Sequence, residues 1–508
     1  MQNPIIILDK FLNSITMYRL ILYGLIAMVI YSLAMSFLGF IPFNWLTLFT
    51  SLIILLLTCF ITNFTFGKLL KATNNQESYL ITALILYFVI APATNFSGGT
   101  SLIYAAIFAI ASKFIFAIRK RHIFNPVAIS ALILGLTGMG YAIWWVGSLI
   151  MLPITLAVGL LVVRKIRRFQ LFFAFVFISL LTMVFFGSLN HRDAFEVIKV
   201  AVLSYPVIFF GTIMLTEPST TPPTKNLRTI YAILVGIIFG SQFKIGPLTP
   251  TPEFALVIGN VFSYLVTNKQ KLFLTFESKK QIAKDTYEFI FTGKDGFNFN
   301  AGQYLEWTLP NVKINSRGNR RYFTIASSPA EDKIKLGLKV FPDSSPFKKK
   351  LLDLKAGDQI IGNQLSGDFV LPKGKNEKLV FIAGGIGITP FRSIIEYLLD
   401  KKETRPITLF YSNKTTDEIT YKDILDRAIK ELGIKTIYLL GDNQTMPKDN
   451  DFEIGRLNVE MIKKYVNDCM DRTFYISGPE AMVNTYRKLL KSMGIKNSRI
   501  KVDYFPGF

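Results

Sequence analysis

Histidine and cysteine are scarce in this sequence, with only two of each among 508 residues. Cys59 and Cys469 lie far apart and no C-x-x-C pair occurs, which excludes an iron–sulfur cluster held by this chain alone. Two stacked haems, each with two histidine ligands, would need four histidines, whereas the chain has only His122 and His191. The simplest interpretation is that both are ordinary interfacial residues. The sequence therefore predicts no haem, no iron–sulfur cluster and no metal site in this chain.

Acidic residues are scarce in the first half of the chain. Residues 1–268 hold 6 of the 35 acidic and 17 of the 57 basic side chains, set among long apolar runs, and residues 269–508 are densely charged. A hydrophobic content of 51% with a mean hydropathy of +0.37 is high for a soluble protein. The net charge of +22 comes without any nucleic-acid-binding motif. This composition predicts a membrane half followed by a soluble half.

Apolar runs of about 20 residues, or shorter ones interrupted by Pro and Gly, are typical of membrane segments. About ten such segments occur, near residues 18–40, 45–63, 79–93, 101–118, 127–140, 143–163, 170–187, 194–216, 230–241 and 253–268. We therefore expect a polytopic α-helical membrane domain of about ten helices over residues 1–268.

The distribution of Lys and Arg predicts the orientation of these segments, because basic residues gather in cytoplasmic loops. If the N-terminus is cytoplasmic, the loops on that side hold Lys68, Lys71, Arg119, Lys120, Arg121, Arg164, Lys165, Arg167, Arg168, Lys225 and Arg228. The opposite loops hold little beyond Arg192 and Lys244. No cleavable signal-peptide pattern is present. We expect a multi-pass protein of the cell (inner) membrane with both termini in the cytoplasm.

The soluble half begins with short β-type stretches separated by turn residues, over residues 269–373, which favours a small antiparallel barrel. It contains RRYFTIASSP at residues 320–329. An arginine, an aromatic ring and a hydroxyl at this spacing could hold a flavin: Arg321 on a phosphate, Phe323 against the ring system and Thr324 near its reactive nitrogen. The alternative is an ordinary exposed edge strand.

Residues 374–508 change to alternating strands and helices, which predicts a parallel α/β domain. The strand KLVFIA is followed by the turn AGGIGITP and by an amphipathic helix. Glycines at 384, 385 and 387 allow a pyrophosphate to approach the backbone, and Thr389 with Pro390 opens a helix whose N-terminus favours anions. TFYISGPEAMV later repeats the order of strand, turn and helix.

With these motifs, residues 271–508 resemble the ferredoxin–NADP reductase superfamily. The family's flavin motif matches Arg321, Phe323 and Thr324; its nucleotide loop matches Gly384, Gly385, Gly387, Thr389 and Pro390; its second turn matches Gly478, Pro479 and Met482. The resemblance implies FAD on the barrel, NAD(P)H on the α/β domain and hydride transfer between them. Ser477 stands where relatives often carry cysteine near the nicotinamide.

The same resemblance implies a terminal aromatic ring over the flavin. Phe505 is the predicted residue, with Tyr504 and Phe508 as alternatives. Ser412, Asn413 and Lys414 could meet the 2′-phosphate of NADPH, although Lys414 is equally explained as a solvated loop charge. The choice between NADH and NADPH stays open.

In the membrane half, FNPVAISALI at residues 124–133 and MLTEPSTTPPTKNLR at 214–228 resemble two signatures of the family that contains the D subunit of Rnf complexes and the B subunit of the sodium-pumping NADH:quinone reductase. This resemblance covers roughly residues 65–265 and implies a second flavin, FMN or riboflavin, in or beside the membrane. The polar groups that could hold it at the cytoplasmic rim are Asn125, Glu217, Ser219, Thr220 and Thr221, braced by Pro126, Pro218, Pro222 and Pro223. The alternative is that these are helix caps and turn residues.

Two further properties of the resembled family find little support in the sequence. A covalent FMN would need a threonine-containing outer loop, for which only Thr100 in TNFSGGTSL is a weak candidate. Ion pumping would need carboxylates within the bilayer, whereas the available ones fall near predicted segment ends, namely Asp193, Glu196, Glu217 and Glu253.

Together these patterns predict a membrane-bound oxidoreductase that passes electrons from cytoplasmic NAD(P)H through FAD to a flavin or quinone in the membrane domain, and from there to an outer acceptor or to other electron-transfer subunits. Two alternatives remain. One is an anchored reductase of a soluble electron-transfer protein, and the other is a non-catalytic flavin-binding redox sensor.

Overall fold

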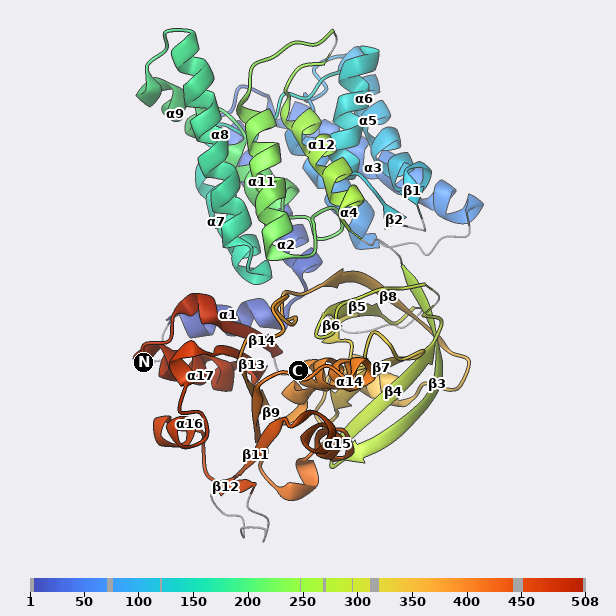
Figure 1. Ribbon diagram of the computed structural model, residues 1–508. Helices are drawn as coiled ribbons and strands as arrows, with labels where there is room; N and C mark the ends of the chain where they lie inside the picture. Colours follow the sequence, from blue (N-terminus) through green and yellow to red (C-terminus); the bar gives the residue numbers. More distant parts are fainter. Residues whose placement is uncertain are drawn as a thin grey trace. The chain divides into compact units, whose positions relative to one another are not determined.

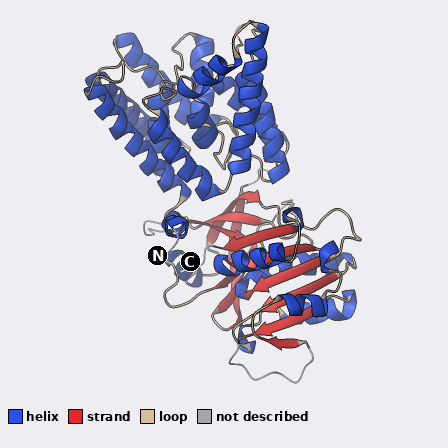
Figure 2. Cartoon of the chain, turned by 90° about the vertical axis from the view of Figure 1, so that its left-hand side faces the viewer, coloured by secondary structure: helices blue, strands red, loops and turns tan. Residues whose placement is uncertain are grey.

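The computed structural model describes residues 4–70, 76–118, 121–246, 248–267, 271–294, 296–310, 319–441 and 451–505. The chain forms two compact units, Met1–Lys269 and Gln270–Phe508. The first is almost entirely helical and the second contains both large sheets (Figures 1 and 2). Each unit has its own buried core.

The helices of the first unit are α1 Pro4–Ser14, α2 Met17–Phe37, α3 Trp45–Leu69, α4 Gln76–Val89, α5 Phe96–Ile115, α6 Pro126–Thr137, α7 Leu152–Ile166, α8 Phe169–Leu189, α9 Ala194–Leu203, α10 Val207–Phe209, α11 Lys225–Gly240 and α12 Pro252–Leu265, with a short hairpin of β1 Ala117–Ile118 and β2 Arg121–His122. Asparagine or threonine side chains cap several of them, as at Asn44, Asn95 and Thr251.

Four of the described helices, α2, α3, α5 and α8, are long and apolar enough to cross a membrane. A fifth span is counted if α9 and the helix after it form one span bent by 64°. About ten spans were expected, and the other five expected segments fall on short helices: α4, α6, α7, α11 and α12 have 14, 12, 15, 16 and 14 residues. A helix of this length is shorter than the hydrocarbon layer it would have to cross. The helical, apolar character of this half is confirmed.

The polar stretch after the bent helix is not helical, yet it is buried. Helix α10 continues into η1 Phe210–Met214, a π-helical turn, and α11 begins only at Lys225. Between them, Thr216, Ser219, Thr220 and Thr221 are each less than a tenth exposed. Irregular backbone within an apolar helical unit must have its polar groups satisfied by the protein itself. This segment therefore depends on the neighbouring helices for hydrogen bonds.

The second unit contains two six-stranded sheets. The strands are β3 Leu272–Ala283, β4 Thr286–Thr292, β5 Tyr304–Thr308, β6 Arg320–Thr324, β7 Ile334–Lys339, β8 Gln359–Ser366, β9 Leu379–Gly384, β10 Ile407–Ser412, β11 Lys435–Leu440, β12 Phe452–Ile454, β13 Thr473–Pro479 and β14 Ile500–Phe505. The first sheet is antiparallel in the order β6-β5-β8-β3-β4-β7, and the second is parallel in the order β12-β11-β10-β9-β13-β14. An antiparallel β domain followed by a parallel α/β domain is what the sequence predicted.

The antiparallel sheet curls so that its first and last strands meet. The Ala326 N–H, two residues after β6, donates to the Lys335 carbonyl on β7 at 2.9 Å. Aromatic side chains fill the interior, with Phe289, Phe291 and Trp307 almost fully buried. Helix α13, Pro346–Leu352, contributes Phe347 to the same core.

The parallel sheet is covered by helices on both faces. Leu379 and Phe381 of β9 pack with α14 Thr389–Lys401 and α15 Lys422–Leu432, whereas Val380 and Ile382 pack with α16 Val459–Tyr465 and α17 Glu480–Ser492. This alternation follows from the period of two in a strand. Strands buried on both faces read as continuous apolar runs, which is why KLVFIA was recognisable in the sequence.

Candidate functional site

The glycine-rich turn lies at the carboxyl end of β9, one of the two central strands of the parallel sheet. A 3₁₀ turn at Gly385–Ile388 leads directly into α14, with Pro390 in its first turn. A Cβ on Gly387 would lie 2.6 Å from the Cα of Gly478 and closer still to the Ser477 carbonyl oxygen. Gly385 has φ +52° and its Cβ position faces open space. Thus one glycine is required by packing, and the other leaves the backbone open toward a ligand.

The second predicted turn lies directly against this loop. It ends β13, which is hydrogen-bonded to β9 on one side and to β14 on the other. Met482 covers the Gly384 position, since a Cβ there would lie 2.7 Å from Met482 Cε. Gly478, with φ +156°, packs against the same side chain. The structure therefore brings the two motifs together, as the parallel order of strands requires.

Ser477 has a fully buried hydroxyl that has no hydrogen-bond partner among the described residues. An unsatisfied buried hydroxyl is costly, so a native structure that keeps one needs a reason. A nicotinamide amide placed over this turn would supply the missing partner.

The predicted flavin strand β6 is the first strand of its sheet and pairs with β5, with Tyr304 opposite Thr324. Arg321 and Phe323 share one face, and both contact the ring of Phe347: the guanidinium carbon lies 5.4 Å from its centroid and the two rings are 5.9 Å apart. Thr324 points the other way and is 2% exposed, with no partner for its hydroxyl in the described chain. Among the described strands β6 pairs with β5 alone, as the alternative interpretation supposed, and the sheet closes onto β7 only after β6 ends, at Ala326. The Thr324 hydroxyl is nevertheless buried and available for a ligand.

Two features of the segment around Phe347, whose ring contacts Arg321, fit a pyrophosphate. Lys348 follows Phe347 and donates to the Lys339 carbonyl at 3.1 Å, and burial, with a smaller effect from the charge of Arg321, lowers its pKa to about 8. The buried Ser345 hydroxyl, just before α13, makes no hydrogen bond to any described residue. Arg321, Lys348 and Ser345 would hold the FAD pyrophosphate, and Thr324 would lie beside its ring system. Lys348 and Ser345 were not predicted from the sequence.

Asp503 is a candidate site residue that sequence reasoning missed. On β14 it is the register partner of Ser477, 26 residues away in the chain, so the two side chains emerge side by side at the end of the sheet. Its Oδ2 atom is buried without a partner in the described residues, and burial raises its pKa to about 7. The only signal in the sequence was an acidic residue within the terminal β-type run KVDYF. Phe505 is the register partner of Pro479, but its side chain, that of Tyr504 and the whole of Phe508 lie outside the described part.

The raised pKa of Asp503 predicts a pH-dependent stability of the second unit. An Asp that titrates near 3.9 when unfolded and near 7 when folded binds more protons in the folded state between these values, so stability falls as pH rises from about 4 to 7. In Asp503→Asn this fall should be lost, and the variant should be the more stable protein at pH 8. The measurement is the unfolding temperature, taken as the temperature at which the flavin is released and its fluorescence rises, recorded from pH 5 to 8.

Asp468→Asn is the matched control for that measurement. A hydrogen bond from Arg472 keeps the pKa of Asp468 at about 2, so its contribution is lost only in strong acid and the change should add no slope between pH 5 and 8. Equal slopes in the unmodified chain and in Asp503→Asn would contradict the assignment of Asp503.

The candidates for NADPH selection lie at the end of β10 without forming a basic cluster. Asn413 is buried, with both amide atoms lacking partners in the described chain, and Lys414 is exposed. The loop that follows carries Asp417 and Glu418, and the Glu418 carboxylate accepts from the Lys414 N–H at 3.3 Å. Lys284 lies 3.9 Å from Asp417 and Lys339 lies 2.9 Å from Glu418, so both carboxylates of this loop already have lysine partners. The arrangement does not distinguish the two nucleotides.

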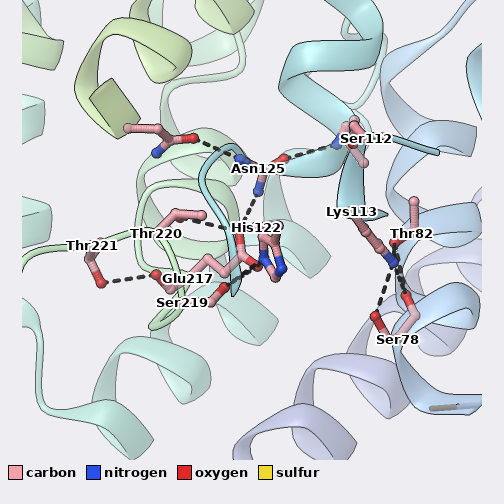
Figure 3. Close-up of polar contacts among 12 residues, drawn as sticks. Ser78, Thr82, Ser112, Lys113, His122, Asn125, Glu217, Ser219, Thr220 and Thr221 are labelled. Carbon is pink, nitrogen blue, oxygen red and sulfur yellow. Dashed lines mark hydrogen bonds and ion pairs between the residues drawn. The ribbon is translucent and has the colours of Figure 1, made fainter. Parts of the chain in front are cut away.

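In the first unit, the predicted polar residues do meet (Figure 3). The Asn125 side-chain oxygen accepts from the N–H groups of Val127 and Ala128 and so caps α6, while its amide donates to Glu217 at 2.8 Å. Ser219 and Thr220 hydroxyls donate to the two oxygens of the same carboxylate at 2.6 and 3.2 Å. Asn125 is therefore both the cap of α6 and a member of the cluster, and Glu217 joins the start of α6 to the buried stretch after η1.

His122, to which the sequence assigned no role, completes this cluster. Its Nε2 lies 3.2 Å from Ser219 Oγ and 3.6 Å from a Glu217 oxygen. Thr221 donates to the Glu217 backbone carbonyl at 2.9 Å and also receives a hydrogen bond from Arg168. We refer to Asn125, His122, Glu217, Ser219 and Thr220 as the rim cluster. Its carboxylate is fully engaged by protein donors, so a ligand entering here would have to replace some of them.

Two other polar residues, both on α5, have plain structural roles. Thr100 lies in the first turns of α5, rather than in a loop, and its hydroxyl donates to the Ser97 carbonyl at 2.8 Å. Lys113 donates to Thr82 and Ser78 of α4 at distances of 2.8 to 3.1 Å and thereby joins α5 to α4. In the part of the chain that the structure describes, no group of three His, Cys, Asp or Glu could hold a metal ion.

Comparison with known proteins relates most of the parallel α/β domain to a described family. The family model for the oxidoreductase NAD-binding domain matches residues 381–488. A flavohemoprotein of Bacillus subtilis is 23% identical over 209 residues, covering 41% of this chain and 51% of the relative. The phenol hydroxylase P5 protein of Acinetobacter pittii is 27% identical over 189 residues, covering 37% of this chain and 52% of the relative. The chain thus spans about half the length of the curated relatives it matches.

Among solved structures, a cytochrome P450 reductase from Amycolatopsis has 24% identity and a TM-score of 0.42, covering 47% of this chain and 71% of that one. A ferredoxin NADP⁺ reductase from Neisseria gonorrhoeae with bound FAD and NADP has 20% identity and a TM-score of 0.40, covering 47% of this chain and 99% of that one. The family match and the relatives agree on one coarse assignment: the second unit is an oxidoreductase module with an NAD-binding domain.

Proposed function

We propose that this protein is an NAD(P)H-dependent, FAD-containing oxidoreductase attached to the membrane by its helical unit. The observation that carries the proposal is the packing of the loop 384–390 against the turn at Ser477 and Gly478, within the matched NAD-binding domain. When bound, FAD would accept a hydride from NAD(P)H and release the electrons one or two at a time.

In this proposal, different residues of the chain bind the nucleotide and FAD. The open backbone at Gly385 and the N-terminus of α14 bind the nucleotide pyrophosphate, while Arg321, Lys348 and Ser345 bind that of FAD. Ser477 and Thr324 offer buried hydroxyls to the reacting rings, and Asp503 holds a proton near neutral pH beside Ser477. Phe505 is proposed to cover the flavin until the nicotinamide enters.

For the electron acceptor we propose a second carrier, a flavin or a quinone, at the rim cluster of the helical unit. Support comes from the resemblance of FNPVAISALI and MLTEPSTTPPTKNLR to the Rnf and sodium-pumping reductase subunits, and from the bent helix that ends in a buried polar segment. Broken helices with polar backbone are typical of binding sites in membrane proteins. In this proposal the membrane is the cell membrane, both termini are cytoplasmic, and an outer acceptor or further subunits take the electrons onward.

Cofactor analysis of the purified chain is the experiment that tests both steps. The proposal predicts two flavins per chain, or one flavin and a quinone, together with steady oxidation of NADH or NADPH in the presence of an artificial acceptor. A single FAD, released completely on denaturation and without any quinone, would rule out the membrane carrier and leave an anchored reductase of a soluble protein. Absence of steady NAD(P)H oxidation would instead favour a redox sensor.

A further inference from the structure

We propose that Arg392 and Glu331 form a positioning pair that holds the nucleotide helix α14 in register with the end of the flavin strand β6. This inference rests on the proposed function, because it concerns the distance between nicotinamide and flavin. It assigns a role to two residues outside both of the sequence motifs.

The pair joins the two halves of the second unit through a bidentate contact. Arg392 lies one turn after Thr389, where α14 begins, and Glu331 lies in the loop that follows β6. One guanidinium nitrogen of Arg392 contacts Glu331 Oε2 and also donates to the Ala326 carbonyl at 3.0 Å, and the other donates to Glu331 Oε1 at 3.0 Å. Ala326 is only two residues beyond Thr324, so the contact ends beside the proposed flavin site.

Neighbouring contacts tie the same two segments together. The Ser393 hydroxyl, in the second turn of α14, donates to the Ser327 carbonyl at 2.7 Å, and the Ser328 hydroxyl donates to Asp400, near the end of the helix, at 2.6 Å. Ser327, Ser328 and Ser393 are fully buried. The helix that begins at the nucleotide loop is therefore joined to the segment that leaves the flavin strand near its start, at Arg392 and Ser393, and near its end, at Asp400.

Arg392 and Glu331 both stay charged over the pH range in which the enzyme would be assayed. Arg392 is 3% exposed and its guanidinium faces the Tyr421 ring, with 5.7 Å from its central carbon to the ring centroid. Lys335 also contacts Glu331, at 2.6 Å. Burial alone would raise the pKa of Glu331, but the contacts from Arg392, Lys335 and the Ser328 N–H lower it to about 2. The stabilising effect of a depressed carboxyl is lost only in strong acid, so the pair stays ionised wherever the enzyme could be assayed.

A bidentate Arg–carboxylate contact fixes orientation as well as distance, and hydride transfer depends strongly on both. Arg392→Gln removes the contact while leaving every proposed cofactor ligand in place. Because a misplacement of about 1 Å can cost on the order of 100-fold in rate, we expect the limiting rate of flavin reduction to fall by roughly 10- to 100-fold. The dissociation constant for NAD⁺ or NADP⁺ and the FAD content should change little. Glu331→Gln and the double variant should show the same loss as Arg392→Gln, because residues that act as a unit are not additive.

Arg405→Gln is the matched control. Arg405 is also buried, pairs with Glu403 at 2.7 Å and donates to the Pro372 and Gly374 carbonyls at 3.0 Å. The two pairs are nearly equally exposed: the side chains of Arg392 and Glu331 are 3% and 19% exposed, and those of Arg405 and Glu403 are 5% and 16% exposed. Arg405 precedes β10, however, and so lies at the amino ends of the strands, away from the nucleotide loop. The Arg405→Gln substitution should therefore lower thermal stability without slowing flavin reduction.

The experiment has two arms, both on the FAD-loaded full chain. Stopped-flow reduction by NADH and by NADPH gives the limiting rate, and amide hydrogen exchange without nucleotide follows residues 325–331. The proposal predicts faster exchange there in Arg392→Gln and not in Arg405→Gln. It is overturned if exchange is unchanged, if both arginine variants slow reduction equally, or if the loss is confined to nucleotide affinity. If the unmodified chain is not reduced by either nucleotide, the proposed function fails, and exchange alone then decides whether the pair couples the two segments.

Discussion

Replacing Gly387 by alanine is expected to abolish NAD(P)H-dependent flavin reduction while FAD stays bound. The added methyl group would lie 2.6 Å from the Gly478 Cα and closer to the Ser477 carbonyl oxygen, both of them backbone atoms that cannot rotate away. The loop and the turn must then separate, which displaces the proposed nucleotide pyrophosphate and Ser477 together. A loss of at least about 100-fold in rate is expected from a displacement of about 1 Å. Rapid mixing with NADH or NADPH, together with the flavin content, measures it.

Gly433→Ala is the control for introducing a methyl group at a glycine of the same domain. Gly433 follows α15 with φ +67°, and a Cβ there meets nothing within 4 Å. The left-handed backbone costs about 1–2 kcal/mol of stability, but the nucleotide loop is untouched, so flavin reduction should continue at its normal rate. Normal reduction in Gly387→Ala would mean that the loop does not bind the nucleotide as proposed.

Replacing Glu217 by alanine should separate the membrane relay from an anchored reductase. The change leaves the Asn125 amide and the hydroxyls of Ser219 and Thr220 without their acceptor, at a cost of about 1–3 kcal/mol for each buried group left unsatisfied. The start of α6 then loses its connection to the buried segment. The relay predicts that NAD(P)H oxidation with a soluble artificial acceptor is unchanged, whereas electron transfer to a quinone in vesicles falls by an order of magnitude or more, about 1.4 kcal/mol or more in barrier.

Glu253→Ala provides a matched control in the same unit. Glu253 is 7% exposed and accepts a hydrogen bond from the Trp144 indole at 2.8 Å. Its removal therefore also leaves a buried donor without an acceptor, but outside the rim cluster. If the two variants lose quinone reduction equally, the effect is one of general stability. If neither loses it, the natural acceptor does not use the rim cluster and the anchored reductase is favoured.

The elements of the second unit were predictable because their signals are local. Each strand of the parallel sheet is an apolar run, and the glycine turn between β9 and α14 is contained in eight consecutive residues. Helical character of the first unit was equally clear. The number of spans was not, because apolar composition does not say where a helix begins: α6 starts only where Asn125 caps it, and α12 where Thr251 does.

The candidate site was predicted in part, and the parts that were missed have a common cause. Gly387 and Ser477 belong to motifs that can be read along the chain, whereas Asp503 acquires meaning only from its register with Ser477. His122 seemed an isolated histidine until the fold brought it within 3.6 Å of Glu217. In each case the partner lies on another element.

By itself, the sequence determined that an apolar helical half precedes a charged half with a nucleotide-binding α/β domain, since periodicity, glycine turns and charge density act over short stretches of chain. Only the tertiary structure decided which polar groups meet. Asn125 and Glu217 are 92 residues apart, and Arg392 and Glu331 are 61 apart. The physical reason is that such pairs depend on strand order and helix packing, which arise from the burial of the whole core, and a pattern of neighbouring residues carries no record of them.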